Sequence, residues 1–104
     1  MAINNTNTVT TIAGVDLTSS YIRIEGKLRA NGGYLIMFKF YKDKASYQAG
    51  DSDINKTLDD SLCASFETAS LTSTQGYDYL HDLAIAELVA RGMDNAKLTK
   101  VDLV

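Results

Sequence analysis

The chain has 104 residues, of which 45% are apolar and 22% are charged, and its formal net charge is −3. This length predicts one domain, which we place at residues 9–104. The acidic balance argues against a dedicated nucleic-acid-binding protein, and no run approaches the ~20 apolar residues of a membrane span. Cys63 is the only cysteine, which excludes an internal disulfide or a cysteine metal cluster and fits assembly in a reducing compartment.

The first residues, MAINNTNT at 1–8, are polar and show no periodicity. They lack the charged and apolar regions of a signal peptide. We expect a flexible N-terminal tail, because chain termini are often mobile. An arm that orders on a neighbouring subunit is the alternative. Residues 9–15 are β-branched and predict an edge strand, which Gly14 would weaken.

The next stretch predicts a β-hairpin with strands at residues 21–29 and 34–42. Apolar and charged side chains alternate along the first strand, which is typical of a strand with one solvated face. Asn31-Gly32 is a strong hairpin signal because both turn residues need positive φ. Gly33 allows a loop that is one residue longer.

The second strand of this hairpin is apolar on both faces, which predicts a central strand. One face belongs to the core, so Leu35, Met37 and Tyr41 on the other face need a second cover. The N-terminal strand, the C-terminal segment or another chain could supply it. Together with Tyr21 and Arg23 of the first strand, these residues form the candidate interaction surface, because an exposed apolar patch usually marks a contact.

Residues 43–60 are polar and too long for a tight turn, and loops of this length are usually functional or mobile. The spacing of Asp51, Asp53 and Asn55 suggests a calcium loop. The required glycine and glutamate are absent from the sixth and twelfth positions, so an EF-hand is not supported. We expect a solvated loop, and we leave open a cation site or a contact with a neighbouring subunit.

Residues 61–68 alternate and predict a third strand of the sheet, with Cys63 on the less buried face. A nucleophilic cysteine would need a histidine base. The one histidine, His81, falls on a different predicted element. We therefore expect an inert thiol and a half-buried, hydrogen-bonded histidine.

A long helix is predicted at about residues 73–91. Thr72 as N-cap with Gln75 three residues later would form a capping box, and Ser73 is the alternative cap. We expect one stripe of this helix to cover the apolar face of the hairpin; the stripe is Tyr77, Leu80, Ala84 and Leu88. Residues 98–103 predict a last edge strand or a tail that docks on a partner. The fold class is thus α+β, a small antiparallel sheet packed on one long helix.

The order of these elements resembles a class of small structural proteins of tailed bacteriophages. The resemblance spans about residues 21–91 and rests on a "Y-x-R-I" strand, a glycine turn, an aromatic pair and a "Q-x-Y-x-x-L" helix. The matching residues are Tyr21, Arg23 and Ile24; Phe40 and Tyr41; Gln75, Tyr77 and Leu80. After Leu80 the helix continues without the proline that this pattern would place there.

The resemblance implies a virion component of the tail, neck or baseplate, assembled in the cytoplasm of the bacterial host. Such a protein acts through copies of itself and through other virion proteins. It is not an enzyme and needs no small-molecule substrate, cofactor, metal, nucleic acid or membrane. No P-loop, dinucleotide-binding or hydrolase motif occurs in the sequence, so we assign no catalytic residue. The alternative is a small intracellular binding module or inhibitor from a mobile element.

Overall fold

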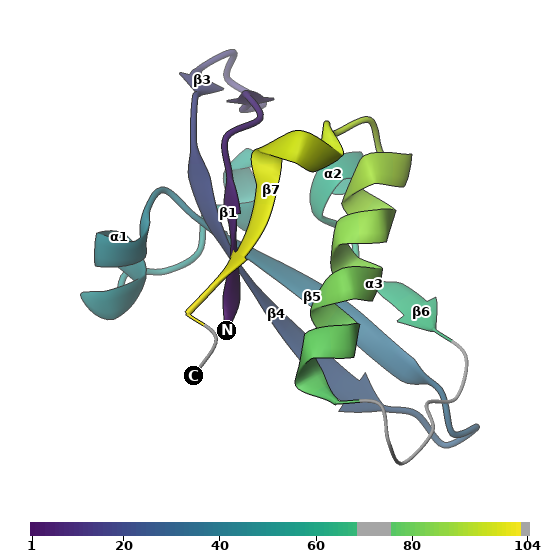
Figure 1. Cartoon of the computed structure of the whole chain (residues 1–104). Coiled ribbons are helices and arrows are strands. Elements are labelled where there is room, and N and C mark those ends of the chain that lie inside the picture. Colours follow the sequence, from purple (N-terminus) through teal and green to yellow (C-terminus); the bar gives the residue numbers. More distant parts are fainter. Residues whose placement is uncertain (69–75, 103–104) are drawn as a thin grey trace.

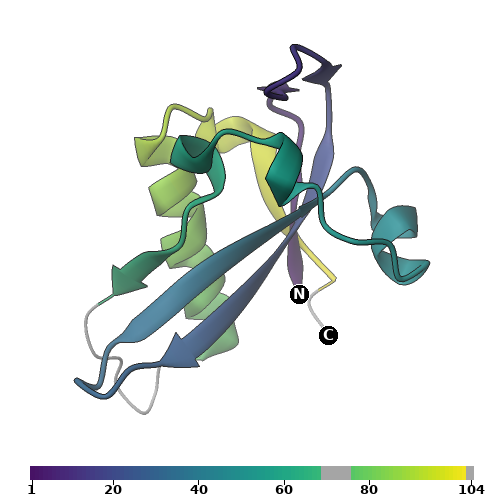
Figure 2. The same ribbon diagram turned by 180° about the vertical axis from the view of Figure 1, so that it is seen from behind.

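A computed structural model of the chain describes residues 1–68 and 76–102 (Figure 1). It confirms an α+β fold, in which helix α3 (Tyr77–Ala90) packs on one face of a five-stranded antiparallel sheet. Figure 2 shows the opposite side, where the long strands lie in front of this helix. The strand order is β6-β5-β4-β1-β7. The strands are β1 (Ala2–Asn5), β4 (Ser20–Leu28), β5 (Tyr34–Tyr41), β6 (Phe66–Thr68) and β7 (Leu98–Val101).

Shorter elements surround this sheet. A separate two-stranded sheet joins β2 (Val9–Thr10) to β3 (Asp16–Leu17). The remaining elements are helices α1 (Lys44–Gln48) and α2 (Asp60–Cys63) and the 3-10 turns η1 (Asn55–Thr57) and η2 (Asn95–Lys97).

The predicted hairpin is confirmed as β4 and β5, which pair from Tyr21↔Tyr41 to Leu28↔Tyr34. Gly32 has a φ of 86°, a left-handed conformation that favours glycine. Gly33 is required for a different reason: a Cβ there would meet the Thr68 carbonyl oxygen at 2.6 Å. The two glycines therefore shape the turn and let β6 approach it.

The main core lies between the sheet and α3. Leu80, Ala84 and Leu88 are buried against the apolar residues of β4 and β5, as the helix stripe predicts. Tyr77 is an exception, because its side chain is 44% exposed and reaches the edge of the sheet. His81 takes a buried place instead, with no exposed surface. The helix is confirmed over Tyr77–Ala90, while the predicted capping residues Thr72, Ser73 and Gln75 lie outside the described residues.

The prediction of a flexible tail at residues 1–8 is wrong, because β1 inserts between β4 and β7. Ala2 and Ile3 are fully buried, and the strand's backbone pairs on both sides. Polar side chains hold the end of this strand. The Asn5 amide donates to the Ser20 hydroxyl at 2.9 Å and its oxygen accepts from the Asn7 backbone at 2.8 Å. Burial of these polar groups with partners explains why a polar sequence forms a central strand.

The predicted edge strand at 9–15 is also wrong. Only Val9–Thr10 is extended, and it pairs with β3 rather than with the main sheet. Gly14, with a φ of 86°, belongs to the turn between them. The chain bends back there because the Gly14 amide donates to the Thr11 carbonyl at 2.9 Å.

The predicted strand at 61–68 is shorter than expected. Asp59 caps helix α2 by accepting a hydrogen bond from the Ser61 amide at 2.8 Å, and this cap directs the chain into a helical turn. Only Phe66–Thr68 pairs with β5. The helical turn also places Cys63 in the main core and not on the outer face. The last strand is confirmed at the sheet edge over Leu98–Val101, and residue 103 lies outside the described residues.

The segment 43–60, predicted as a solvated loop, contains α1 and η1. Asp43 caps α1 through a hydrogen bond of 2.7 Å from the Ser46 amide, which lowers the pKa of the Asp43 carboxyl. The Asn55 side chain binds the backbone of β5. Within residues 1–68 and 76–102, no group of three or more His, Cys, Asp or Glu side chains is arranged to hold a metal ion.

We predict that Asn5→Ala lowers the free energy of unfolding by about 2 kcal/mol, because it leaves buried polar groups of Ser20 and Asn7 without partners. Urea denaturation followed by circular dichroism measures the change. Asn4→Ala is the control, since Asn4 lies on the same strand with its side chain exposed. Equal effects of the two substitutions would contradict the structural role of Asn5.

Candidate functional site

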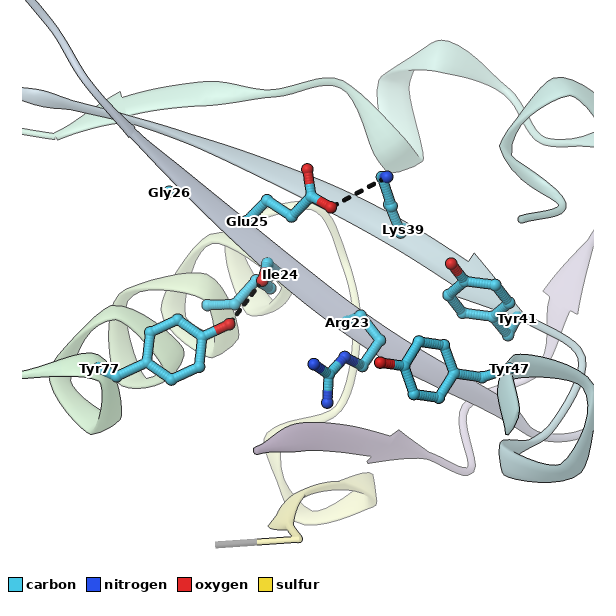
Figure 3. A pocket seen from close by; sticks show the side chains of 8 residues that line it. All are labelled: Arg23, Ile24, Glu25, Gly26, Lys39, Tyr41, Tyr47 and Tyr77. Carbon is cyan, nitrogen blue, oxygen red and sulfur yellow. Dashed lines mark hydrogen bonds and ion pairs between the residues drawn. The ribbon is translucent and has the colours of Figure 1, made fainter. Parts of the chain in front are cut away.

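A cleft of about 430 Å³ follows the middle of strand β4 (Figure 3). Four consecutive residues of this strand line it, together with side chains from β5, α1 and α3. The lining residues are Arg23, Ile24, Glu25, Gly26, Lys39, Tyr41, Tyr47 and Tyr77. Successive strand residues face opposite sides of a sheet, so a cleft lined by all four must pass along the edge of the strand.

One end of the cleft is closed by a second small apolar cluster. Tyr21, Tyr41 and the α1 residue Tyr47 pack together there, with ring centroids of Tyr47 at 5.8 Å from Tyr21 and 5.1 Å from Tyr41. Ala2 from the N-terminal strand joins this cluster, as does Val101 at the end of β7. Tyr41, one of the apolar residues on the outer face of β5, is therefore covered by other parts of the same chain.

Arg23 lies between this cluster and the open part of the cleft. Its guanidinium carbon is 4.7 Å from the centroid of the Tyr47 ring, a cation–π arrangement. The same guanidinium donates a hydrogen bond of 3.1 Å to the Met1 carbonyl. Arg23 makes no ion pair with a carboxylate in the described part of the chain. It is thus an ordered cation at the cleft wall.

The opposite wall carries an ion pair between the two long strands. Lys39 and Glu25 approach to 3.0 Å, and this hydrogen bond raises the pKa of Lys39 (Figure 3). Both side chains are partly exposed, so the pair contributes little to stability. Its consequence is local, since it neutralises one acidic group beside the cleft.

The candidate interaction surface is only partly brought together. Arg23 and Tyr41 line the cleft, whereas Tyr21 is buried beneath it in the aromatic cluster. Leu35 and Met37 are half-buried on the neighbouring strand and do not line the cleft. A contact role for these five residues stays a prediction.

Among the described residues, no strand covers the edge of β4 beside the cleft. Partner β1 pairs with Ser20, Tyr21 and Ile22 only. In an antiparallel ladder, successive residues direct their N–H and C=O groups to alternate sides. The Arg29 amide donates to Gly33 at 2.8 Å, so the odd-numbered residues of β4 bond to β5. The even-numbered residues Ile24, Gly26 and Leu28 then direct their backbone groups toward the cleft side.

One of these groups has a partner. The Tyr77 hydroxyl donates to the Ile24 carbonyl at 2.8 Å, as Figure 3 shows. For Gly26 and Leu28, we find no partner on this side among residues 1–68 and 76–102. Within the part of the chain that the structure describes, the floor of the cleft is therefore an unpaired strand edge.

The other long strand has its edge closed. As far as the chain is described, β6 pairs only with Tyr34, Leu35 and Ile36 of β5. Beyond that point the Asn55 side chain donates to the Phe38 carbonyl at 2.7 Å and accepts from the Phe40 amide at 2.9 Å. The Ile54 amide donates to the Phe40 carbonyl at 2.8 Å. Asn55 and Ile54 thus replace a neighbouring strand, and no such group protects β4 in the described residues.

Cys63 and His81 have separate surroundings and no contact with each other in the described structure. The Cys63 sulfur lies 3.6 Å from the Asp59 carbonyl oxygen, and burial raises the pKa of this thiol. The His81 Nδ1 atom lies 2.9 Å from the Tyr77 carbonyl oxygen, which makes Nδ1 the donor. The expected hydrogen-bonded histidine is thus correct for one nitrogen. The buried Nε2 atom has no partner within the described residues.

Sequence reasoning missed the two tyrosines contributed by helices. Tyr77 was expected in the core, and Tyr47 lay in a segment expected to be a loop. Asp43 is a preferred N-cap residue whose carboxylate can accept from the backbone amide three residues later, at Ser46, and this signal would have indicated α1.

Searches of known protein families, curated proteins and solved structures found no match. No described helix is long and apolar enough to cross a membrane. Function must therefore be inferred from the surface of the chain itself.

We predict that His81 makes the fold sensitive to acid. Burial lowers the pKa of His81 below its ordinary value of 6.5, so the folded state resists protonation. Above pH 6.5 the imidazole of His81 is mostly neutral in both the folded and the unfolded chain. As the pH falls through it, the unfolded chain binds the proton and the folded chain does not, so stability decreases toward the lowered folded pKa.

The substitution His81→Leu should remove this dependence. It loses the Nδ1 hydrogen bond to Tyr77 but also removes the buried Nε2 atom, which has no partner among the described residues, so stability at pH 7 should change little. Urea denaturation of both proteins at intervals between about pH 7.5 and 5 measures the difference. An equal loss of stability in the two proteins over that range would show that His81 is not responsible.

Proposed function

We propose that this chain is a non-enzymatic structural or assembly protein of a bacteriophage virion, acting through self-association and contacts with other subunits. The observation that carries this proposal is the exposure of large apolar side chains at opposite ends of the molecule. Ile12 and Val15, on the turn between β2 and β3, are 72% and 57% exposed. Leu28, at the far end of β4, is 65% exposed.

These positions are well separated. The molecule measures 40 × 28 × 27 Å, and Figure 1 places the β2–β3 turn and the tip of the long hairpin at its two ends. A subunit with one apolar contact at each end can bind two neighbours at once, which is the requirement for a ring or a longer array. Single exposed apolar residues are common on monomers, so the support comes from their placement. The likeness to small phage proteins adds the virion setting.

The alternative, a small binding module or inhibitor, is favoured by a different observation. The cleft holds an ordered arginine and three tyrosine side chains, residue types that are enriched where proteins bind partners. Under this alternative the chain stays monomeric and binds one partner through the cleft.

We predict that the purified protein self-associates and that its average mass rises with concentration in sedimentation equilibrium. Ile12→Glu should weaken this association about tenfold, since a charge would replace an apolar contact side chain. Ser52→Glu is the matched control, because it places the same charge on an exposed residue outside this turn.

Mass spectrometry of purified particles tests the virion assignment, which predicts the chain among their components. A strict monomer that is absent from such particles and binds no tail or neck protein would contradict the proposal. Capture of a single host enzyme by that monomer would favour the inhibitor.

A further inference from the structure

The unpaired edge of β4 has a sequence that is complementary to itself. Its residues are Ile24, Glu25, Gly26, Lys27 and Leu28. If two copies of this stretch run antiparallel about Gly26, Glu25 of one lies opposite Lys27 of the other. Ile24 then lies opposite Leu28. Opposite charges that face each other across two strands are favourable. A second copy of the same strand is therefore a fitting partner for this edge.

We propose that two copies of this chain pair through the free edges of β4, antiparallel and centred on Gly26. The inference rests on the proposed self-association and names one of its contacts, the one at the Leu28 end of the molecule. Glu25 of each copy then faces Lys27 of the other, and Ile24 faces Leu28. The same patch serves both subunits, which is the arrangement of a two-fold symmetric dimer.

The backbone geometry permits this pairing. Ile24, Gly26 and Leu28 direct their N–H and C=O groups outward, and the register sets outward residues against outward residues. An antiparallel exchange forms two hydrogen bonds between the Gly26 residues and up to four more between Leu28 and Ile24, once the Tyr77 hydroxyl makes room at Ile24. The cleft of about 430 Å³ beside Ile24 and Gly26 provides room for the incoming strand. The Ile24 carbonyl, which already accepts from Tyr77, has a second lone pair for the new bond.

Charge selects this register over its neighbours. If the partner strand shifted by one residue, residues whose backbone groups point toward β5 would lie opposite residues whose backbone groups point outward. Such pairs cannot form the hydrogen bonds of an antiparallel sheet. A shift by two residues sets Glu25 against its own copy in one direction and Lys27 against its own copy in the other, and like charges directly opposite are destabilising. At the margin, Arg23 faces Arg29 of the other copy, but Arg29 is already paired with Glu67 at 3.1 Å.

The pairing also covers exposed apolar surface. Ile24, Gly26 and Leu28 share the face of the sheet on which α3 packs. In the dimer, Leu28 of one copy lies opposite Ile24 of the other and beside the exposed Tyr77 ring. Two Leu28 side chains and two Tyr77 rings thereby lose solvent contact, which favours association.

The first experiment reverses one charge. In sedimentation velocity over a concentration series, Lys27→Glu should raise the dimer dissociation constant about tenfold or more, because two attractive pairs become repulsive. Adding Glu25→Lys to it restores the opposite charges and should recover most of the affinity. Lys97→Glu is the control for net charge, as Lys97 is exposed on η2 and lies in neither β4 nor the β2–β3 turn. Circular dichroism confirms that each variant is folded.

The second experiment reads the register directly. Residues that face each other between hydrogen-bonded positions have Cα atoms about 4.5 Å apart, which a disulfide can span. Glu25→Cys and Lys27→Cys are made as separate proteins and oxidised alone or mixed. We expect a covalent dimer from the mixture and little from either variant alone, because like positions lie about 7 Å apart or more. Cys63 is buried and does not compete.

The outcomes separate the two proposals. If the wild type associates but Lys27→Glu binds equally well, or the mixture gives no more cross-link than the single variants, the β4 contact is overturned and self-association stands. If the wild type stays monomeric up to about 1 mM, both proposals fail.

Discussion

The two central strands of the sheet are longer than the strands beside them, and most of the structure follows from this inequality. β4 and β5 pair over their whole length, whereas β1 ends opposite Ile22 and β6 ends opposite Ile36. Each long strand therefore extends beyond its outer neighbour. On β5 the exposed stretch is closed by Asn55, whereas on β4 only the hydroxyl of Tyr77 binds it within residues 1–68 and 76–102. The cleft is the space that remains.

Hydrogen bonds between polar side chains position the two strands nearest the chain ends, β1 and β7. The Asn5 and Asn7 amides bond to each other, to Ser20 and to the backbone at Asp94, so they connect β1 with the segment that leads into β7. Buried amides with a full set of partners rigidify a structure, while the same groups without partners are costly. The alternating apolar pattern positions the hairpin and α3, and this polar network positions the two strands at the chain's ends.

This division explains how much of the fold could be predicted from the sequence. The hairpin and the long helix carry local signals of period and turn chemistry, and both are confirmed over most of their length. The last strand, predicted without a clean alternation, is present over Leu98–Val101. β1 carries no such signal, because its stability comes from partners distant in sequence. The helical turn α2 depends on one cap, Asp59, within an otherwise strand-like alternation. Of the cleft residues, Arg23 and Tyr41 were predictable from strand alternation, whereas Tyr47 depended on a helix too short to show a period.

The pairing of Ala2 with Val101 places the two most distant strands of the chain side by side. Sheets with such remote contacts fold slowly, because a long loop must close before the contact forms. During synthesis, β4 and β5 are complete long before β7 emerges. Until then, β1 lacks its neighbour on one side. A partner that binds only the finished sheet would therefore distinguish mature subunits from those still being made, and this timing would order assembly after folding.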